Sequence, residues 1–169
     1  EYIPKKGGFI LASNHMSNLD PMVLGAASSR RLDFMAKQGL FNNLIFGRLI
    51  SKVGAFPVKR GSADISAIKE AIHRIEEGHG LLLFPEGSRR SDMPIERPLP
   101  GVGFLAAKAN APVIPAFISG TGLALPRGSK FIRPARISVR FGRQISLERR
   151  MPYQDFAQLI MENIRNLSC

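Results

Sequence analysis

A histidine and an aspartate lie five residues apart where a predicted strand gives way to a predicted helix. The segment reads Asn14-His15-Met16-Ser17-Asn18-Leu19-Asp20. In a strand-to-helix turn, the imidazole of His15 can reach solvent and ligand. A carboxylate at the start of the helix can fold back and hold one ring nitrogen, so that the other nitrogen can take a proton from an alcohol. The spacing therefore predicts a general base, His15, and its partner, Asp20.

Other interpretations of this pair remain open. Asp20 can be only a helix N-cap, Asn14 only a turn former and His15 only a hydrogen-bonded loop residue. The pair could also bind a metal, but no third ligand is evident, because His73 lies in a predicted helix and His79 in a glycine turn. The chain contains no G-x-S-x-G motif, which argues against an acyl-enzyme formed on serine.

Two further polar segments follow predicted strands and could bind phosphate. Lys59 and Arg60 stand at a strand end before a helix, where a point charge, a guanidinium fork and the helix dipole all favour an anion. Taken alone, they could equally be two solvated charges. After the next strand, Gly87 permits a tight turn, Arg89 can clamp a phosphate, and Glu86 can orient an arginine or a hydroxyl.

Short apolar runs predict strands, and apolar residues at three- and four-residue spacing predict the helices that position these segments. The expected strands are Gly8–Ser13, Leu32–Ala36, Ala55–Val58, Gly80–Phe84, Pro112–Ile118 and Arg136–Phe141. The expected helices are Asp20–Ser28 with Asp20 as N-cap, Leu40–Val53, one capped by Ser62 or Asp64 that ends at Gly78, Val102–Asn110, and Pro152–Leu167. A polar loop is expected over Arg89–Pro100.

This alternation predicts an α/β fold, a three-layer sandwich in which helices flank a mostly parallel central sheet. At 169 residues, the chain is expected to form a single domain over residues 1–169. Sites in such sheets form outside the carboxyl ends of the strands, and the polar segments begin at such ends. The apolar strand containing Val113, Ile114 and Pro115 is expected in the core or in the wall of an acyl pocket.

The chain is strongly basic, with 24 Lys and Arg against 13 Asp and Glu, a net charge of +11. This balance predicts an anionic partner: nucleic acid, an anionic membrane surface or a phosphorylated substrate. A nucleic-acid-binding domain is disfavoured, because no recognition motif is present and the chain has no tryptophan and only two tyrosines to stack on bases. The single cysteine, Cys169, excludes an internal disulfide, and no apolar run reaches the length of a membrane span.

Taken together and in this order, the segments resemble the glycerophospholipid acyltransferase family, specifically the 1-acylglycerol-3-phosphate acyltransferases. The resemblance covers roughly residues 3–121 and is most specific in its first and third blocks. The family patterns are N-H-x-S-x-x-D, a second block that usually ends in an acidic or lysine residue followed by arginine, F-P-E-G-T-R-S and V-I-P. They are met here at Asn14–Asp20, at Lys59-Arg60, at Phe84–Arg90 with Ser88 for Thr and Arg90 for Ser, and at Val113–Pro115.

The resemblance implies transfer of a fatty acyl group from acyl-CoA or acyl carrier protein to the free hydroxyl of lysophosphatidic acid. The hydroxyl would attack the thioester directly, without an acyl-enzyme, and no metal or other cofactor would be needed. His15 would be the general base and Asp20 its partner, and backbone amides around Gly87 are candidates to stabilise the oxyanion. The acceptor phosphate would be bound by Lys59, Arg60, Glu86, Gly87 and Arg89.

The resemblance also implies association with the cytoplasmic face of an anionic membrane. Family members usually carry hydrophobic helices before the first block, whereas this sequence opens with Glu1, so N-terminal anchoring helices are expected to be absent from it. Cationic pairs at Lys5-Lys6, Arg30-Arg31 and Arg149-Arg150 are expected to contact lipid. Phe41 and Phe46 are expected in the core, with membrane contact as the alternative. A non-catalytic phospholipid-binding adaptor is the remaining competing function.

Overall fold

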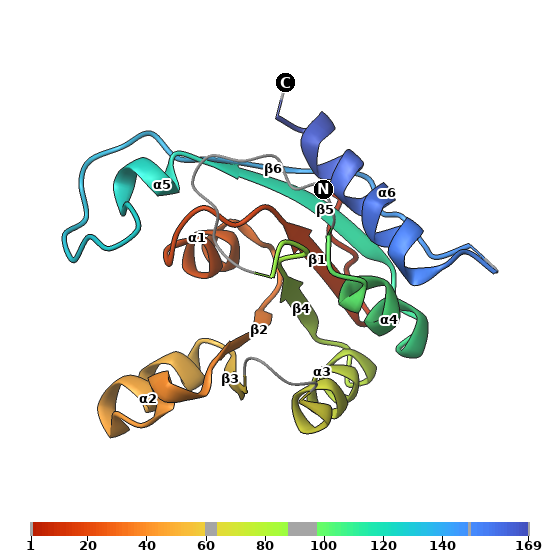
Figure 1. Ribbon diagram of the computed structural model, residues 1–169, viewed down its shortest axis with the longest axis horizontal. Helices are drawn as coiled ribbons and strands as arrows, with labels where there is room; N and C mark the ends of the chain where they lie inside the picture. The colour runs from red at the N-terminus through yellow and green to blue at the C-terminus, as the bar shows by residue number, and fades with distance from the viewer. Residues whose placement is uncertain (1, 60–63, 88–97, 149, 169) are drawn as a thin grey trace.

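Six strands of the computed structural model form one sheet (Figure 1). The structure describes residues 2–59, 64–87, 98–148 and 150–168. The strands are β1 Phe9–Ser13, β2 Leu32–Lys37, β3 Ala55–Val58, β4 Gly80–Leu83, β5 Val113–Ser119 and β6 Ser138–Phe141. They lie in the order β3-β2-β4-β1-β5-β6, and every neighbouring pair is parallel except β5 with β6.

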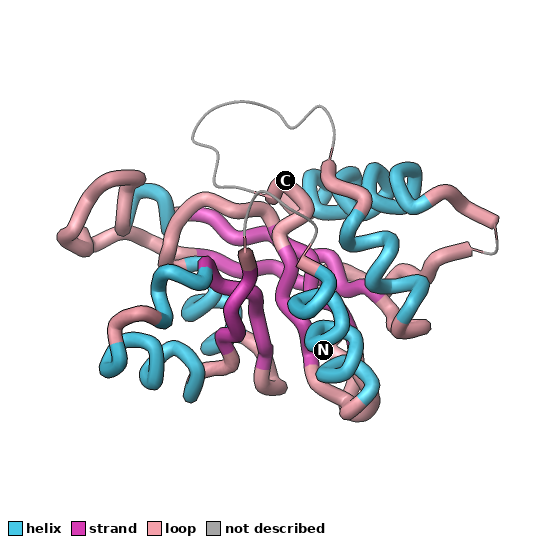
Figure 2. Tube along the Cα trace, turned by 60° about the horizontal axis from the view of Figure 1, so that its bottom comes forward, coloured by secondary structure: helices cyan, strands magenta, loops and turns pink. Residues whose placement is uncertain are grey.

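Helices cover both faces of this sheet, as Figures 1 and 2 show. They are α1 Asp20–Ala27, the short 3-10 helix η1 Gln38–Phe41, α2 Leu44–Lys52, α3 Ile65–Glu76, α4 Gly101–Lys108, α5 Thr121–Ala124 and α6 Tyr153–Asn166. Helices α3, α4 and α6 contribute the core of one face, and α1 contributes the core of the other. The predicted α/β architecture is confirmed.

Strand β1 lies inside the sheet and is apolar on both sides. Ile10 and Ala12 pack with α3, α4 and α6, whereas Phe9 and Leu11 pack with α1. All four side chains have 0% of their surface exposed. A strand covered on both faces has a continuous apolar sequence, which is why the residues before Asn14–Leu19 are hydrophobic. We call Asn14–Leu19, the segment between β1 and α1, the histidine turn.

The helix predicted over Leu40–Val53 is wrong as a single helix. The side chain of Asn43 accepts hydrogen bonds from the backbone N–H groups of Ile45 and Phe46, and so caps α2 at its start. Residues Gln38–Phe41 form the separate helix η1. Because an asparagine cap competes with the interior of a helix, the apolar spacing across it does not continue one helix.

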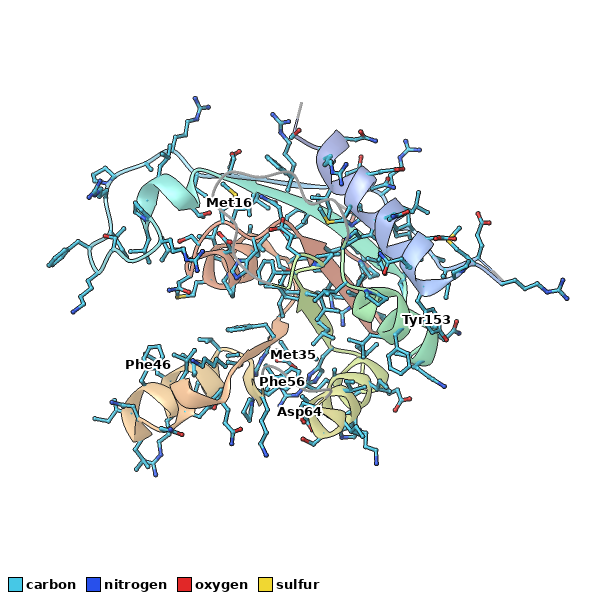
Figure 3. The ribbon with its side chains drawn as sticks, in the orientation of Figure 1. Met16, Met35, Phe46, Phe56, Asp64 and Tyr153 are labelled. Atoms are coloured by element: carbon cyan, nitrogen blue, oxygen red, sulfur yellow. The ribbon has the colours of Figure 1, made fainter. Side chains whose placement is uncertain are left out.

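Helix α2 exposes most of its apolar side chains. Phe46, which Figure 3 labels, is 44% exposed, Ile45 is 84% exposed and Leu49 is 58% exposed. The expectation that Phe46 belongs to the core is therefore wrong, and Phe41 is only half-buried. Within the described residues, no helix is both long and apolar enough to pass through a bilayer.

Two local predictions near the histidine turn also differ from the structure. Asp20 is the first residue of α1 and not its N-cap; Leu19 occupies that position without a side-chain hydrogen bond. Helix α5, a single turn after β5, was not predicted. Most of the polar loop expected over Arg89–Pro100 lies outside the described residues.

Arg30, which is expected to contact lipid, also has a structural role in the fold. Its guanidinium donates to the carbonyl oxygens of Pro4 at 2.9 Å and Gly7 at 2.7 Å, and also to that of Gly78. It lies 5.1 Å from the centre of the Phe9 ring. Arg30 therefore ties the segment before β1 to the turn between α3 and β4.

Candidate active site

The histidine turn is organised by one carboxylate oxygen. His15 Nδ1 lies 2.7 Å from Asp20 Oδ2, and the same oxygen accepts the backbone N–H groups of Met16 at 2.6 Å and Ser17 at 2.8 Å. Asp20 is 0% exposed. The carboxylate at the start of α1 thus folds back onto the turn as predicted. Because it accepts from Met16 and Ser17 as well as pairing with His15, the loop wraps around it.

This pairing leaves Nε2 as the basic nitrogen of His15. A proton on Nδ1 is the one that can be donated to a carboxylate, so the Nε2 lone pair remains for an incoming hydroxyl. Nε2 has no hydrogen bond within the part of the chain that the structure describes, and the His15 side chain keeps 12% of its surface exposed. The geometry is that of a base held by an orienting acid.

Phe84, the residue after β4, fixes the plane of the imidazole. The two rings are stacked, with centroids 3.9 Å apart and an interplanar angle of 15°. The contact arises because β4 and β1 are neighbours in the sheet, so the residues that follow the two strands meet at the same edge. An aromatic face also favours a cation above it, which suits an imidazolium formed during proton transfer. The sequence alone did not indicate this role for Phe84.

Glu86 belongs to the same edge and contacts the backbone of the histidine turn. Its Oε1 accepts the backbone N–H of His15 at 3.3 Å. A carboxylate repels a phosphate dianion, so Glu86 fits an organising role beside an anion site better than direct contact with the anion. The structure thereby brings the first and third polar segments together.

Gly87 makes the turn that the sequence predicts. Its φ is +70°, in the region that favours glycine, and its N–H donates to the Phe84 carbonyl at 2.9 Å. A Cβ at this position would stand 2.4 Å from Leu99 Cδ1. Because the Gly87 N–H is already bonded to Phe84, an oxyanion donor near this turn would have to be another of the backbone amides around Gly87.

Two buried side chains connect the histidine turn to the neighbouring strand β5 and to the residue that follows α5. Asn14 pairs with the peptide groups of Ile118 in β5, donating to its carbonyl and accepting its N–H, each at 2.8 Å. Ser17 donates through Oγ to the Leu125 carbonyl at 2.9 Å. Asn14 is therefore more than a turn former. In the sequence, the only sign of these anchoring contacts was that Asn14 and Ser17 are polar residues in a short loop.

The second cationic segment lies further along the same edge. Lys59 follows β3, and β2 and β4 stand between β3 and β1. With strands about 4.8 Å apart, the ends of β3 and β1 are separated by roughly 14 Å. The Lys59 side chain is exposed, and its backbone N–H donates to Asp64 at 2.8 Å. Arg60 and Arg89, the two predicted phosphate ligands with guanidinium groups, lie outside the described residues.

The apolar strand segment occupies the core. Val113 and Ile114 are each 0% exposed and pack on opposite faces of β5, and Pro115 is also buried. None of the three lines the hollow between α4 and the start of α6 or the hollow beside α1 and β2. Burial accounts for these residue types without an acyl ligand, and the acyl-pocket role stays a prediction.

Neither hollow contains the histidine pair, and the described residues include no group of three or more His, Cys, Asp or Glu placed to hold one metal ion. The larger hollow, about 690 Å³, lies at the amino-terminal end of β5, between α4 and the start of α6. The site is thus defined by converging side chains at a sheet edge.

Known proteins share this sequence pattern and this fold. The family model described as Acyltransferase matches residues 1–119. A 1-acyl-sn-glycerol-3-phosphate acyltransferase of Bacillus subtilis is 35% identical over 122 residues, which cover 71% of this chain and 60% of the relative. One of Streptococcus pneumoniae is 33% identical over 141 residues, covering 82% and 50%. The chain therefore spans about half to three fifths of the length of these relatives.

The same fold occurs in a crystal structure from Thermotoga maritima. That protein, a 1-acyl-sn-glycerophosphate acyltransferase, matches with a TM-score of 0.77 at 21% identity. The match covers 99% of this chain and 69% of the other. At this identity the likeness establishes the architecture.

Proposed function

This chain belongs to the Acyltransferase family, and we propose that it transfers a fatty acyl group from a thioester to the free hydroxyl of lysophosphatidic acid. The observation that carries the proposal is the His15–Asp20 pair, with its 2.7 Å contact and its stacked ring, at the carboxyl edge of the sheet. The relatives from Bacillus subtilis and Streptococcus pneumoniae, both 1-acyl-sn-glycerol-3-phosphate acyltransferases, support the same acceptor.

In the proposed reaction, the acceptor hydroxyl lies against Nε2 of His15. Nε2 takes the proton as the oxygen attacks the thioester carbonyl, and the buried carboxylate of Asp20 stabilises the imidazolium. Collapse of the tetrahedral intermediate breaks the carbon–sulfur bond, and the imidazolium returns the proton to the departing thiolate. No protein nucleophile is required, because the substrate hydroxyl occupies the position that a serine holds in a hydrolase triad.

The acceptor phosphate is proposed to bind among Lys59, Arg60, Glu86, Gly87 and Arg89, where the three cations attract the anion and Glu86 and Gly87 shape the turn beside it. Glu86 contacts the backbone of His15, which supports the turn after β4 as the part nearest the reacting hydroxyl. Lys59 lies two strands beyond β4, so its contribution in this proposal is to the field that attracts the anion. The donor is proposed to be acyl-CoA or acyl carrier protein, and the site of action the cytoplasmic surface of an anionic membrane.

The first test pairs two donors with a panel of acceptors. Acyl-CoA and acylated acyl carrier protein are each incubated with lysophosphatidic acid, glycerol 3-phosphate and other lysophospholipids, and the products are identified by mass spectrometry. Phosphatidic acid formed from lysophosphatidic acid is the expected result. Absence of thioester release with both donors would instead identify a phospholipid-binding adaptor.

The second test removes the base. We expect His15→Ala to lower kcat by ~10²–10⁴-fold while lysophosphatidic acid binding is nearly unchanged, because the imidazole acts on the transition state. His73→Ala is the matched control, since that side chain is 61% exposed on α3 and should leave turnover intact. If binding and rate fell equally for His15→Ala, the histidine would be a binding residue and its assigned role would be wrong.

A further inference from the structure

The end of α5 and the segment that follows it toward β6 combine exposed apolar side chains with positive charge. We call residues 123–136 the projecting loop; in Figures 1 and 2 it extends from the body of the fold beyond α1. Leu123 is 73% exposed, Phe131 81% and Ile132 68%. Moving such exposed apolar groups from water into an apolar phase would lower the free energy of the system.

The charges of the projecting loop have one sign. Its cations are Arg127, Lys130, Arg133 and Arg136, all exposed, and it contains no Asp or Glu. Phe131 and Ile132 lie directly between two of these cations. Apolar tips flanked by Lys and Arg match the boundary between acyl chains and anionic headgroups, where the tips enter the hydrocarbon and the cations meet the phosphates.

Hydrogen bonds give the projecting loop a defined shape. The backbone N–H of Arg133 donates to the Ala124 carbonyl at 2.7 Å and closes the base of the loop. Ser129 Oγ accepts the Phe131 N–H at 3.2 Å and donates to the Phe131 carbonyl at 3.0 Å. Less ordering entropy is therefore lost when this segment binds a surface than when a disordered one does.

The base of the projecting loop is joined to the histidine turn. The Leu125 carbonyl accepts the Ser17 hydroxyl, three residues before Asp20. A Cβ on Gly122 would lie 3.7 Å from Met16, and Figure 3 places Met16 beside α5. A surface bound by Phe131 and Ile132 would consequently be held in a fixed position relative to His15.

We propose that the projecting loop docks the domain on an anionic phospholipid surface by inserting Phe131 and Ile132 between headgroups. Charge complementarity selects this partner, since four cations without an acid would oppose a basic partner and a purely apolar partner would leave them desolvated. The link to catalysis rests on the proposed function, because a lipid acceptor would reach His15 from the docked surface.

The chain contains no tryptophan, which makes Phe131→Trp a unique optical probe. The full chain carrying this substitution is titrated with phosphatidylcholine vesicles that contain or lack phosphatidylglycerol, with no acyl donor or lysolipid present. We expect the emission to shift to the blue on the anionic vesicles. Ile65→Trp is the control probe, since Ile65 is 65% exposed on α3, away from the loop, and its emission should not move.

Vesicle sedimentation tests the energetics with matched substitutions. Ile132→Ser should weaken binding roughly tenfold, and Ile65→Ser, of nearly equal exposure, should leave it unchanged. Replacing Arg127, Lys130 and Arg133 by Ala should weaken binding by roughly 100-fold, at about fivefold per charge. Replacing the exposed residues Lys69, Lys108 and Arg143 by Ala makes the same change in net charge elsewhere and should weaken it much less.

The outcomes separate this proposal from the proposed function. Absence of a blue shift on vesicles that bind the protein, equal binding to neutral vesicles, or a shift that depends on protein concentration without lipid would each overturn lipid docking by the loop. His15→Ala should bind vesicles like the wild-type protein. If vesicle binding followed the expected pattern while no acyl transfer occurred with any donor, the proposed function would fail and the docking surface would stand.

Discussion

At the scale of single residues, the candidate site depends on how firmly the imidazole is held. Asp20 presents one oxygen to three donors, so the carboxylate cannot turn away without breaking two backbone contacts. Phe84 restricts the remaining freedom of the ring by stacking on it. A base that is already oriented avoids reorganisation in the transition state, and proximity effects of this kind are lost with small displacements.

Phe84→Leu tests the contribution of the stacked ring. We expect kcat to fall by roughly three- to tenfold, because an aromatic contact contributes about 0.5–1.5 kcal/mol beyond its buried area. The acceptor KM should change little, since the imidazolium forms only during the reaction. Steady-state kinetics measure both constants, and Phe84→Tyr should restore the rate. A folded Phe84→Leu protein with wild-type kcat would show that stacking has no catalytic weight.

At the scale of elements, the ends of β1 and β5 are coupled through Asn14. Its amide satisfies both the N–H and the carbonyl of Ile118, in a region where 8% or less of either residue is exposed. The turn that carries His15 is thereby fixed to the strand that leads into α5. This contact joins residues that are 104 positions apart in the chain.

Asn14→Ala should destabilise the fold by about 2–5 kcal/mol, because it leaves a buried donor and a buried acceptor without partners. Denaturant unfolding followed by circular dichroism measures the loss. Ser119→Ala, which removes a hydroxyl paired with Ser138 at 2.8 Å near the same strand end, is the control and should cost less than about 0.5 kcal/mol. Similar losses of stability for the two variants would show that the contact between Asn14 and Ile118 does not stabilise the fold as proposed.

Helix α3 begins with a cap that depends on pH. The hydroxyl of Ser66 and the backbone N–H groups of Lys59 and Ala67 donate to Asp64, and they lower the pKa of its carboxyl from 3.8 to about 2. Because the folded pKa is the lower one, the stabilising contribution is complete above about 3.8 and is lost as the pH falls through about 2.

Asp64→Ala should therefore lower the urea midpoint at neutral pH and lower it progressively less as the solution is acidified. The comparison requires urea unfolding of both proteins across a series of pH values down toward the acid range. Asp155→Ala is the control, because Asp155 lies in the first turn of α6 and is not the residue that caps that helix. A midpoint difference that stayed constant down to the lowest pH would contradict the ionised cap.

At the scale of the whole molecule, adjacent arginines have different functions. Arg30 bridges three backbone carbonyls from two distant segments, whereas the Arg31 side chain is 64% exposed and lies 3.5 Å from the buried Asp33. The cationic pair that the sequence assigned to lipid is thus partly structural. The net charge of +11 remains a property of the surface as a whole, available for attraction to anions.

Arg30→Gln should destabilise the protein by about 2–4 kcal/mol, since charge-assisted hydrogen bonds to carbonyls are lost. Arg31→Gln makes the same chemical change one residue later and should cost no more than about 1 kcal/mol, as is usual for exposed ion pairs. Thermal unfolding of the two variants gives the comparison directly. Equal destabilisation would mean that the bridge contributes no more than the exposed pair.

The amino-acid sequence by itself determined the types and order of most elements and the partners within one turn. Apolar runs and helical spacing are local signals, so the strands, α3 and the His15–Asp20 contact could be predicted, and the cap of α3 was narrowed to Ser62 or Asp64. The break at Asn43 was missed because the apolar pattern continues across it, although the capping asparagine is itself visible in the sequence.

Only the tertiary structure decided which distant residues meet. The order of strands places β4 beside β1, and this neighbourhood brings Phe84 and Glu86 to His15 while keeping Lys59 two strands further away. It also decided that α2 is exposed and that Arg30 bonds to the backbone of two distant segments. Strand pairing across long stretches of chain depends on the packing of whole faces, and local periodicity carries no record of it.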